Sequence, residues 1–436
     1  MRARITYERA VRDAVEEYEL PLVIGVLADL GGPAQAPWRD RKFVEVNRGN
    51  FEQARAALPG GTESEGAEAA WEGLRYLVSH AGDANGVRIR ALSVSREELL
   101  EDFRAAGEFD GSALFEKVYT EVYGARLEAP FGLLVADYEF GHEDEDIELL
   151  GYLSGVASAA LAPLIAGASP RMFGARTFAD LPAPGPLARM FESEGRARWS
   201  GFRNRPEAAY VGLVLPRILL PGRGRRVWGN PAYALAGRVA EAFVQYGWCA
   251  AIRGVEAGGL VTDLRALSEG GPVEAAIGED QEGVLQQLGF ISLCHWKRTD
   301  RAVFFSVPSC QRPPVFSVDQ ATAAARLAAQ LPYVLAVSRF GQYLKVLMRD
   351  RSAASMSREA CEGFLEAWLS QYVMEEDEAS EETKTLYPLR EGRVEVVENP
   401  EKPGGLIAIA YLRPHFQLQD LGLCQRVVAA LPPSAA

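Results

Sequence analysis

Cysteine and histidine are scarce in this chain of 436 residues, with five and four residues respectively. The cysteines lie far apart and none forms a CxxC pair; they are Cys249, Cys294, Cys310, Cys361 and Cys424. This spacing gives no zinc cluster of the usual kind and no disulfide framework. We therefore expect the cysteines to be small buried apolar residues, and we expect no metal site.

Long apolar runs are also missing. No stretch approaches the roughly 18 apolar residues of a membrane helix, and the first residues, MRARIT, lack the apolar core of a secretory signal. We therefore expect a cytoplasmic protein without membrane insertion. The formal net charge of -13 argues against general binding to nucleic acid, which needs a basic face. A local basic patch is still possible at Arg223, Arg225 and Arg226. The alternative interpretation of these residues is a solvated loop.

The familiar signatures of catalysis are absent as well. The sequence has no GxSxG elbow, P-loop, HExxH or GxGxxG after a strand, so we predict no catalytic residue and no cofactor site. Two weaker candidates are His142 beside the acidic run 143–146, which could hold a metal, and Asp137 with Glu139 at the end of a buried strand. Their alternatives are a solvated helix start and structural carboxylates. A soluble α/β enzyme using Asp137, Glu139 and His142 is the competing function.

The N-terminal part carries strand patterns. Residues 2–8 alternate between apolar and polar, with Ile5 and Tyr7 on the apolar face, which predicts a half-buried strand. Residues 20–27 form a continuous apolar run, typical of a strand that is buried on both faces. Two shorter patterns follow, a strand over 42–46 and a helix over 51–58.

Two helix starts are marked by local chemistry. Ser95 and Glu98 form the spacing of a capping box, in which the serine accepts from the third amide and the glutamate reaches back. The acidic run 143–146 favours a helix start because negative charge complements the helix dipole there.

The order of these patterns predicts a mixed α/β (α+β) fold. After a Pro/Gly-rich linker near residue 60, helices and strands alternate to about residue 310, as in an α/β domain. Residues 318–375 read as helical, with breaks at Pro332 and near Arg351. Strands return over the last 45 residues, and residues 417–431 could form a final helix. We predict three parts: a strand-rich segment 1–61, an α/β domain 62–310, and a region 311–436 whose strands complete a strand-rich domain with 1–61.

Several longer stretches stand out from this generic pattern. One is ELPLVIGVLADLGGPAQAPWRDRKFVEVNRGNF, residues 19–51. The others are AAWEGLRYLV, FDGSALFEKVYTEVYG, LLVADYEFGHEDEDIELL, WGNPAYALAGRVAEAFVQYGWCAAIRGVEAGGLV, LPYVLAVSRFGQYLKVLMRDR and DEASEETKTLYPLREGRVEVVE. Together they resemble the contractile sheath of type VI secretion systems. About residues 1–58 resemble the N-terminal part of its small subunit, and about residues 65–431 resemble its large subunit, so the resemblance implies a sheath-type fold.

The departures from the family pattern are informative. In the family the two subunits are separate chains, whereas here they resemble a fusion. The C-terminal portion of the small subunit and the N-terminal helical region of the large subunit have no counterpart. In the family these two parts pair into the outermost sheath domain, which a recycling AAA+ ATPase engages. The resemblance therefore makes that ATPase a doubtful partner.

The resemblance implies a structural subunit, not an enzyme. It predicts a helical tube of identical copies around an inner tube protein, joined to a baseplate, which contracts to drive secretion or injection. A sheath of a phage-tail-like particle is the alternative within the structural class.

Strand exchange between copies would hold such an array together. The interface strands would carry Ile5 and Tyr7 from the N-terminus and, from the C-terminal strands, Val394, Val396, Ile407, Ile409 and Tyr411. Adding a strand to a sheet edge gains main-chain hydrogen bonds, while alternate side chains set the register. Asp420 and Arg426 on the final helix would face the inner tube.

Overall fold

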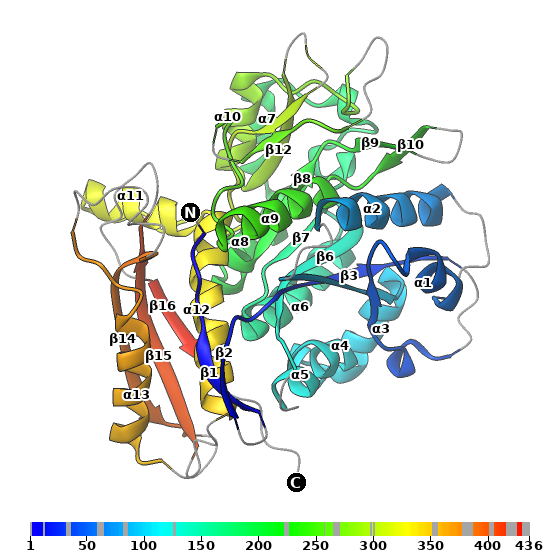
Figure 1. The fold of residues 1–436 in the computed structure, drawn as a ribbon. Coiled ribbons are helices and arrows are strands. Elements are labelled where there is room, and N and C mark those ends of the chain that lie inside the picture. Colours follow the sequence, from blue (N-terminus) through cyan, green and yellow to red (C-terminus); the bar gives the residue numbers. More distant parts are fainter. Residues whose placement is uncertain are drawn as a thin grey trace.

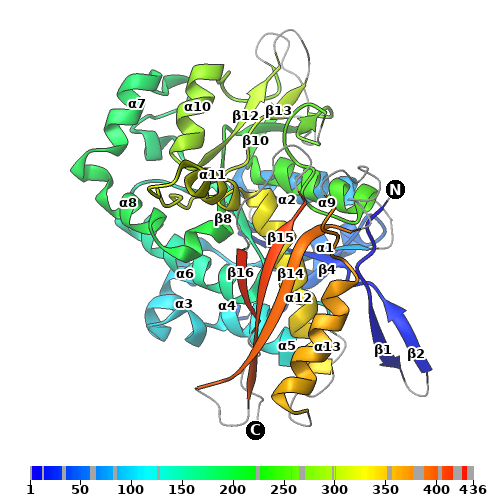
Figure 2. The same cartoon turned by 90° about the vertical axis from the view of Figure 1, so that its left-hand side faces the viewer.

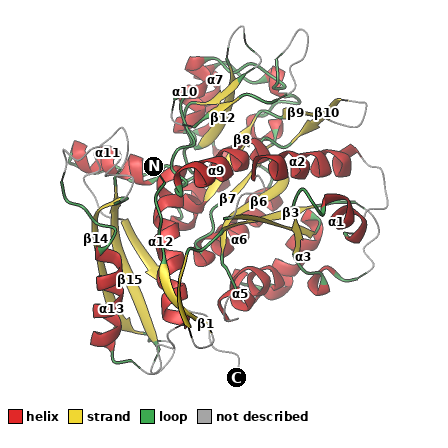
Figure 3. Ribbon diagram, viewed as in Figure 1, coloured by secondary structure: helices red, strands yellow, loops and turns green. Residues whose placement is uncertain are grey.

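The computed structural model describes most of the chain. It covers residues 2–11, 14–31, 36–58, 65–81, 86–124, 128–221, 226–256, 258–264, 271–296, 299, 301–350, 356–376, 387–400, 405–415 and 425–429. A large α/β body and a smaller layer of C-terminal strands lie on either side of one long helix, α12 (Leu331–Asp350) (Figure 1). Figure 3 shows the same division by type of element.

A nine-stranded mixed sheet forms the centre of the large body, in the order β11-β13-β12-β8-β7-β6-β3-β5-β4. The strands are β3 (Leu22–Ala28), β4 (Val44–Val46), β5 (Val87–Ser93), β6 (Phe131–Phe140), β7 (Leu164–Ala168), β8 (Val211–Leu215), β11 (Leu260–Val261), β12 (Phe290–His295) and β13 (Ala302–Phe304). The six strands from β12 to β5 run parallel, and antiparallel strands flank them. The predicted mixed α/β class is confirmed.

Helices cover both faces of this sheet. They are α1 (Phe51–Ala57), α2 (Glu65–Ala81), α3 (Arg96–Ala106), α4 (Ala113–Phe115), α5 (Glu121–Gly124), α6 (Asp144–Ala160), α7 (Pro184–Phe191), α8 (Ala197–Arg203), α9 (Ala232–Tyr246) and α10 (Glu279–Gln287). Strand β3 shows why both faces of the sheet must be shielded from solvent, because it is apolar on both sides. Val23 and Leu27 belong to the core on one side, while Ile24 and Val26 belong to the core under α2 and α9. The continuous apolar run predicted this burial correctly.

The placement of β3 and β4 differs from the predicted domain division. The segment 1–61 was expected to join the C-terminal strands in a strand-rich domain, but β3 pairs with β5 and β6 at the centre of the large sheet. The physical reason is the apolar run itself, because a strand that is apolar on both faces is stable only between two helical layers. The boundaries at residues 61 and 310 stay a prediction.

The helical stretch after residue 318 is present, but its first break falls at residues 329–330, before Pro332, which lies in the first turn of α12; residues 351–355, at the second predicted break, lie outside the described part of the chain. It forms α11 (Asp319–Ala328), α12 and α13 (Arg358–Ser370). A separate three-stranded antiparallel sheet follows, in the order β14-β15-β16, from β14 (Leu389–Glu398), β15 (Leu406–Pro414) and β16 (Gln425–Ala429).

The predicted final helix over 417–431 is wrong for residues 425–429. These residues form β16, which pairs with β15. Val427 and Ala429 are buried while Val428 is 37% exposed, so the segment alternates with the period of a strand. The residues before it, 416–424, lie outside the described part of the chain.

Two hairpins complete the fold, β1 (Tyr7–Val11) with β2 (Ala14–Tyr18) and β9 (Ile218–Pro221) with β10 (Arg226–Gly229). The N-terminal strand therefore begins at Tyr7. The sequence pattern had predicted a start at residue 2. The predicted alternation holds, since Ala3, Ile5 and Tyr7 are all buried.

Helix α12 ties these parts together, and every residue from Leu331 to Met348 is buried. Its polar side chains bond to main-chain groups of distant segments. Gln342 Nε2 donates to the carbonyls of Leu161 at 2.6 Å and Phe131 at 3.2 Å. At Gly341 the helix approaches its neighbours so closely that a Cβ atom would lie 2.5 Å from Leu161 Cδ1. A larger residue there would require Leu161 and Val427 to shift.

We expect Gln342→Leu to destabilise the protein by roughly 2–4 kcal/mol, because it removes the side chain that donates to two buried carbonyls. Gln371→Leu is the matched control, since Gln371 is exposed just after α13. Urea unfolding followed by circular dichroism measures both. Equal unfolding midpoints for the two variants would contradict the role of Gln342.

Candidate assembly interface

The C-terminal sheet has two unlike faces. Val394 and Val396 of β14 and the alternate residues of β15, Ala408, Ala410 and Leu412, are buried. The opposite face of β15 carries Ile407, Ile409 and Tyr411, which are only half-buried. The structure therefore places the predicted C-terminal interface residues on one sheet but on both of its faces.

The outward face is ordered by cross-strand pairs. Arg393 lies opposite Tyr411, with its guanidinium carbon 4.8 Å from the centre of the tyrosine ring. Arg413 pairs with Glu391 at 2.6 Å. Such pairs fix the register between β14 and β15, so the half-buried apolar residues of β15 keep a defined spacing along the strand.

The outer edge of β14 is covered by α13. The main-chain N–H of Val394 donates to Glu366 Oε2 at 2.7 Å, and that of Val396 donates to Glu362 Oε2 at 2.8 Å. These N–H groups point away from β15, where a further strand would pair. Four residues of helix rise about 6 Å and two residues of strand about 6.8 Å, so the two carboxylates match the two amides.

Strand β1, which begins at Tyr7, lies on the other side of α13 from β14 (Figure 2). Within the protomer Ile5 and Tyr7 do not join the C-terminal sheet. Both side chains are buried, and the Tyr7 hydroxyl donates to Asp350 Oδ2 at 3.1 Å. Tyr343 of α12 packs edge-on against the Tyr7 ring and donates its hydroxyl to the Ile5 carbonyl. The N-terminal segment is therefore docked on α12 and α13.

Trp368 of α13 and Tyr372, in the turn that follows the helix, also satisfy the main chain of this segment. The Thr6 N–H donates to the Tyr372 hydroxyl at 3.0 Å. The Thr6 carbonyl accepts from the Trp368 indole at 2.8 Å and from the Tyr372 hydroxyl at 3.0 Å. Sequence patterns did not single out Glu362, Glu366, Trp368 or Tyr372. The spacing of the two glutamates is a local signal, but their partners lie about 30 residues away.

The proposed tube-facing pair is only partly described. Asp420 lies outside the described residues, and Arg426 lies in β16 opposite Tyr411 of β15. The prediction placed both residues on one face of a final helix. Arg426 lies in a strand instead, so it is not part of such a helical face.

Asp137, one member of the candidate enzyme site, is occupied by structural contacts. Its Oδ2 accepts from the Tyr233 hydroxyl at 3.0 Å, which ties β6 to α9. Burial raises the pKa of the Asp137 carboxyl to about 6, and the hydrogen bonds from Tyr233 and Asn230 partly oppose this shift.

The other members of that site are separated from it by their own partners. Glu139 forms a two-pronged ion pair with Arg217, at 2.5 and 2.7 Å. His142 Nδ1 lies 2.9 Å from the carbonyl oxygen of Arg171.

The acidic run beside His142 is paired rather than free. Its ion pairs are Glu143 with Arg171, Asp144 with Arg198, Glu145 with Arg104, and Asp146 with Arg96. Among the residues that the structure describes, no group of three or more His, Cys, Asp or Glu side chains could hold a metal ion. Nor is any described helix long and apolar enough to cross a membrane.

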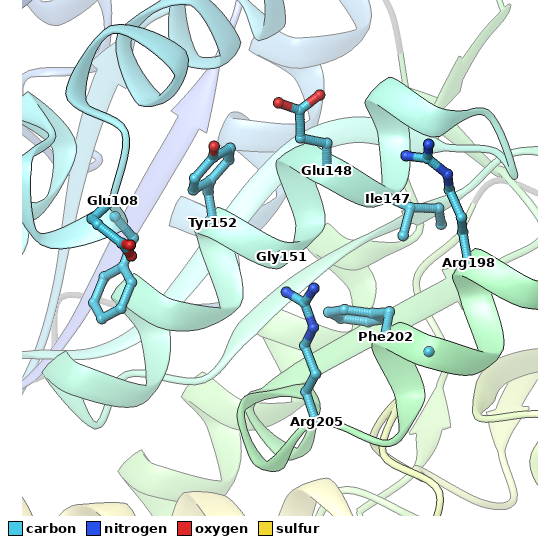
Figure 4. A pocket seen from close by; sticks show the side chains of 10 residues that line it. Glu108, Ile147, Glu148, Gly151, Tyr152, Arg198, Phe202 and Arg205 are labelled. Carbon is cyan, nitrogen blue, oxygen red and sulfur yellow. The ribbon is translucent and has the colours of Figure 1, made fainter.

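A hollow of about 550 Å³ lies beside α6 and α8 (Figure 4). Glu148 and Arg198 at its rim are already paired with Arg104 and Asp144. Arg205 points into it near Gly151, but as an exposed side chain it makes no enclosed site. The described residues around this hollow contain no nucleophile next to a base.

With this geometry in place, family comparisons decide between the alternatives. Residues 62–223 and 220–311 match the family model described as EvpB/VC_A0108, tail sheath N-terminal domain. Residues 320–431 match the tail sheath gpW/gp25-like domain of the same family, and residues 1–59 match the model described as Type VI secretion system, VipA. The chain belongs to the type VI secretion system tail sheath family. It is a subunit of a contractile sheath.

One curated relative agrees with the family match. The chain is 36% identical over 400 residues to the type VI secretion system sheath protein TssC1 of Pseudomonas aeruginosa, covering 84% of this chain and 80% of the relative. Among solved structures, a sheath tail protein of Listeria innocua is 10% identical with a TM-score of 0.48, covering 95% of this chain and 96% of that one. The contracted helical sheath of the anti-feeding prophage is 12% identical with a TM-score of 0.45, covering 98% and 96%.

The raised pKa of Asp137 predicts a pH dependence for this sheath subunit. The unfolded chain releases the proton near pH 3.8 and the folded protein near pH 6. Between these values the folded state holds more protons, so its stability falls as the pH rises from about 4 to 6, by roughly 1–2 kcal/mol. Asp137→Asn keeps an oxygen for Tyr233 and removes the titration.

The measurement is urea unfolding of both proteins at several pH values between 4 and 7. We expect the variant to gain stability relative to the wild-type protein as the pH rises through this window. Parallel stability curves would show that Asp137 does not titrate near pH 6.

Proposed function

We propose that this chain is a single-chain sheath subunit, in which a small-subunit-like segment is fused to a large-subunit-like body. The VipA match over residues 1–59 and the sheath-domain matches from residue 62 support this arrangement. The packing supports it as well, because β3 comes from the first segment yet lies between β5 and β6 with Val23 and Val26 fully buried.

In this proposal copies of the chain build a helical tube around an inner tube protein, starting at a baseplate. A head-to-tail contact that does not close into a ring produces a filament, so identical subunits suffice. Contraction needs two packings of the subunits that differ by a few kcal/mol, and it needs no catalytic site. The structural contacts of Asp137, Glu139 and His142 favour this mechanical role over the enzyme alternative.

Strand exchange is the proposed link between copies. Residues 2–6 precede β1 and have no ladder partner among the described residues of their own protomer, and Arg4 is exposed. In an array this segment would leave its protomer and add to the C-terminal sheet of a neighbour. Several main-chain hydrogen bonds, each worth about 0.5–1.5 kcal/mol net, would then join each pair of copies.

We expect Arg4→Pro to abolish tube formation while the protomer stays folded. Proline removes one N–H from the donated segment, and its side chain replaces one that is exposed in the protomer. Arg4→Ala is the matched control and should form tubes. Negative-stain microscopy and size-exclusion chromatography give the readout, with circular dichroism to check the fold.

Deletion of residues 1–10 is a more severe test of strand donation than Arg4→Pro. We expect the deletion to give a protein that does not assemble. Abundant tubes from this deletion would refute strand donation by the N-terminus.

The recycling AAA+ ATPase is not a partner in this proposal. Only seven residue positions separate Ala57, the end of α1, from Glu65, the start of α2. The domain that the ATPase engages in the family would have to lie there. We expect a pull-down with such an ATPase to recover no more of this chain than of an unrelated control protein; specific recovery would contradict the proposal.

A further inference from the structure

A second cavity, of about 500 Å³, lies at the C-terminal ends of three helices, α8, α10 and α11. Arg203 is the last residue of α8, Gln287 is the last residue of α10, and Arg326 lies in the last turn of α11. Arg312 comes from the segment that leads from β13 to α11. Three arginines from three separate segments therefore line one cavity.

Arg203 is built into this cavity and held rigidly. It is only 4% exposed. Its Nε donates to the Cys310 carbonyl at 2.9 Å, and its Nη2 donates to the Gln287 carbonyl at 3.0 Å. Gly289 packs so closely against the guanidinium that a Cβ atom would lie 3.1 Å from Nε and from Nη2. The position of this positive charge is therefore fixed before any ligand binds, which lowers the cost of binding.

The lining does not neutralise this charge. The described residues around the cavity include no Asp or Glu, whereas Glu108 and Glu148 line the hollow beside α6 and α8. Burial lowers the pKa of the Arg203 guanidinium to about 10, and the charge of Arg312 acts in the same direction. Each helix end adds a negative charge of only about half a unit. Three guanidiniums therefore leave the cavity with a net positive charge.

The size and the donors of the cavity indicate the kind of anion that fits. A volume of about 500 Å³ exceeds what a single acetate or phosphate fills and lies in the usual range of small-molecule sites. The side-chain amides of Gln286 and Gln311 add N–H donors to the lining. Guanidinium groups bind carboxylate and phosphate through paired N–H···O bonds. A ligand with several anionic groups can therefore contact more than one arginine at once.

We propose that this cavity is a binding site for a small molecule with two or more carboxylate or phosphate groups. Arg203 is its fixed anchor, while Arg312 and Arg326 are exposed side chains that can adjust to the ligand. The bound anion joins α11 to the ends of α8 and α10, and it offsets the repulsion between Arg203 and Arg312. Every residue of this site belongs to one protomer, so binding does not require assembly into a tube.

Isothermal titration calorimetry of the full chain at constant ionic strength tests the site with acetate, citrate and pyrophosphate. We expect one saturable site per chain for citrate or pyrophosphate. Acetate should bind at least about tenfold more weakly, because it contacts fewer guanidiniums. Comparing citrate with pyrophosphate distinguishes a carboxylate ligand from a phosphate ligand. Absence of saturable binding for both, or equally tight binding of acetate, would overturn the proposal.

Arg312→Gln and Arg326→Gln test whether the guanidiniums of the cavity hold the ligand. Both side chains are exposed, so the fold should persist, which circular dichroism checks. We expect each variant to bind the tighter probe about tenfold or more weakly than the wild-type chain.

Arg88→Gln is the matched control, because it removes the same charge at an exposed position of β5. Four strands separate β5 from β12, the strand that follows Gly289. We expect this control to bind like the wild-type chain. Undiminished affinity in both cavity variants, or an equal loss in Arg88→Gln, would show that the cavity is not the binding site.

Discussion

The whole structure depends on one buried helix whose polar side chains hold main-chain groups from separate parts of the chain. Arg339 of α12 donates to the carbonyls of Leu20 and Pro21, and Lys345 donates to the Ala159 carbonyl at 2.6 Å. Burial lowers the pKa of the Lys345 ammonium to about 7. Because a buried polar group without a partner is costly, α12 has one acceptable position along its axis.

This constraint gives the subunit the character of a rigid body. The large sheet and the C-terminal sheet both pack against α12, so they move together. Contraction of a sheath rearranges subunits relative to one another, and such a transition transmits force only if each subunit keeps its shape. The compliant parts are then confined to the contacts between copies.

The sequence was most informative where local chemistry decides the structure. The capping box of Ser95 and Glu98 is formed by both hydrogen bonds, and the apolar run of β3 is buried on both faces. It was less informative for residues 425–429, where a short apolar segment fits helix and strand alike until β15 offers an edge. The glutamates of α13 could not be assigned, because their role depends on β14 lying beside the helix.

Under the proposed single-chain arrangement, fusion changes which contacts limit assembly. Between separate chains the pairing of β3 with β5 and β6 would depend on the concentration of both subunits. A covalent link makes this pairing intramolecular and fixes the ratio of the two parts at one to one. Only the formation of contacts between copies then depends on the protein concentration.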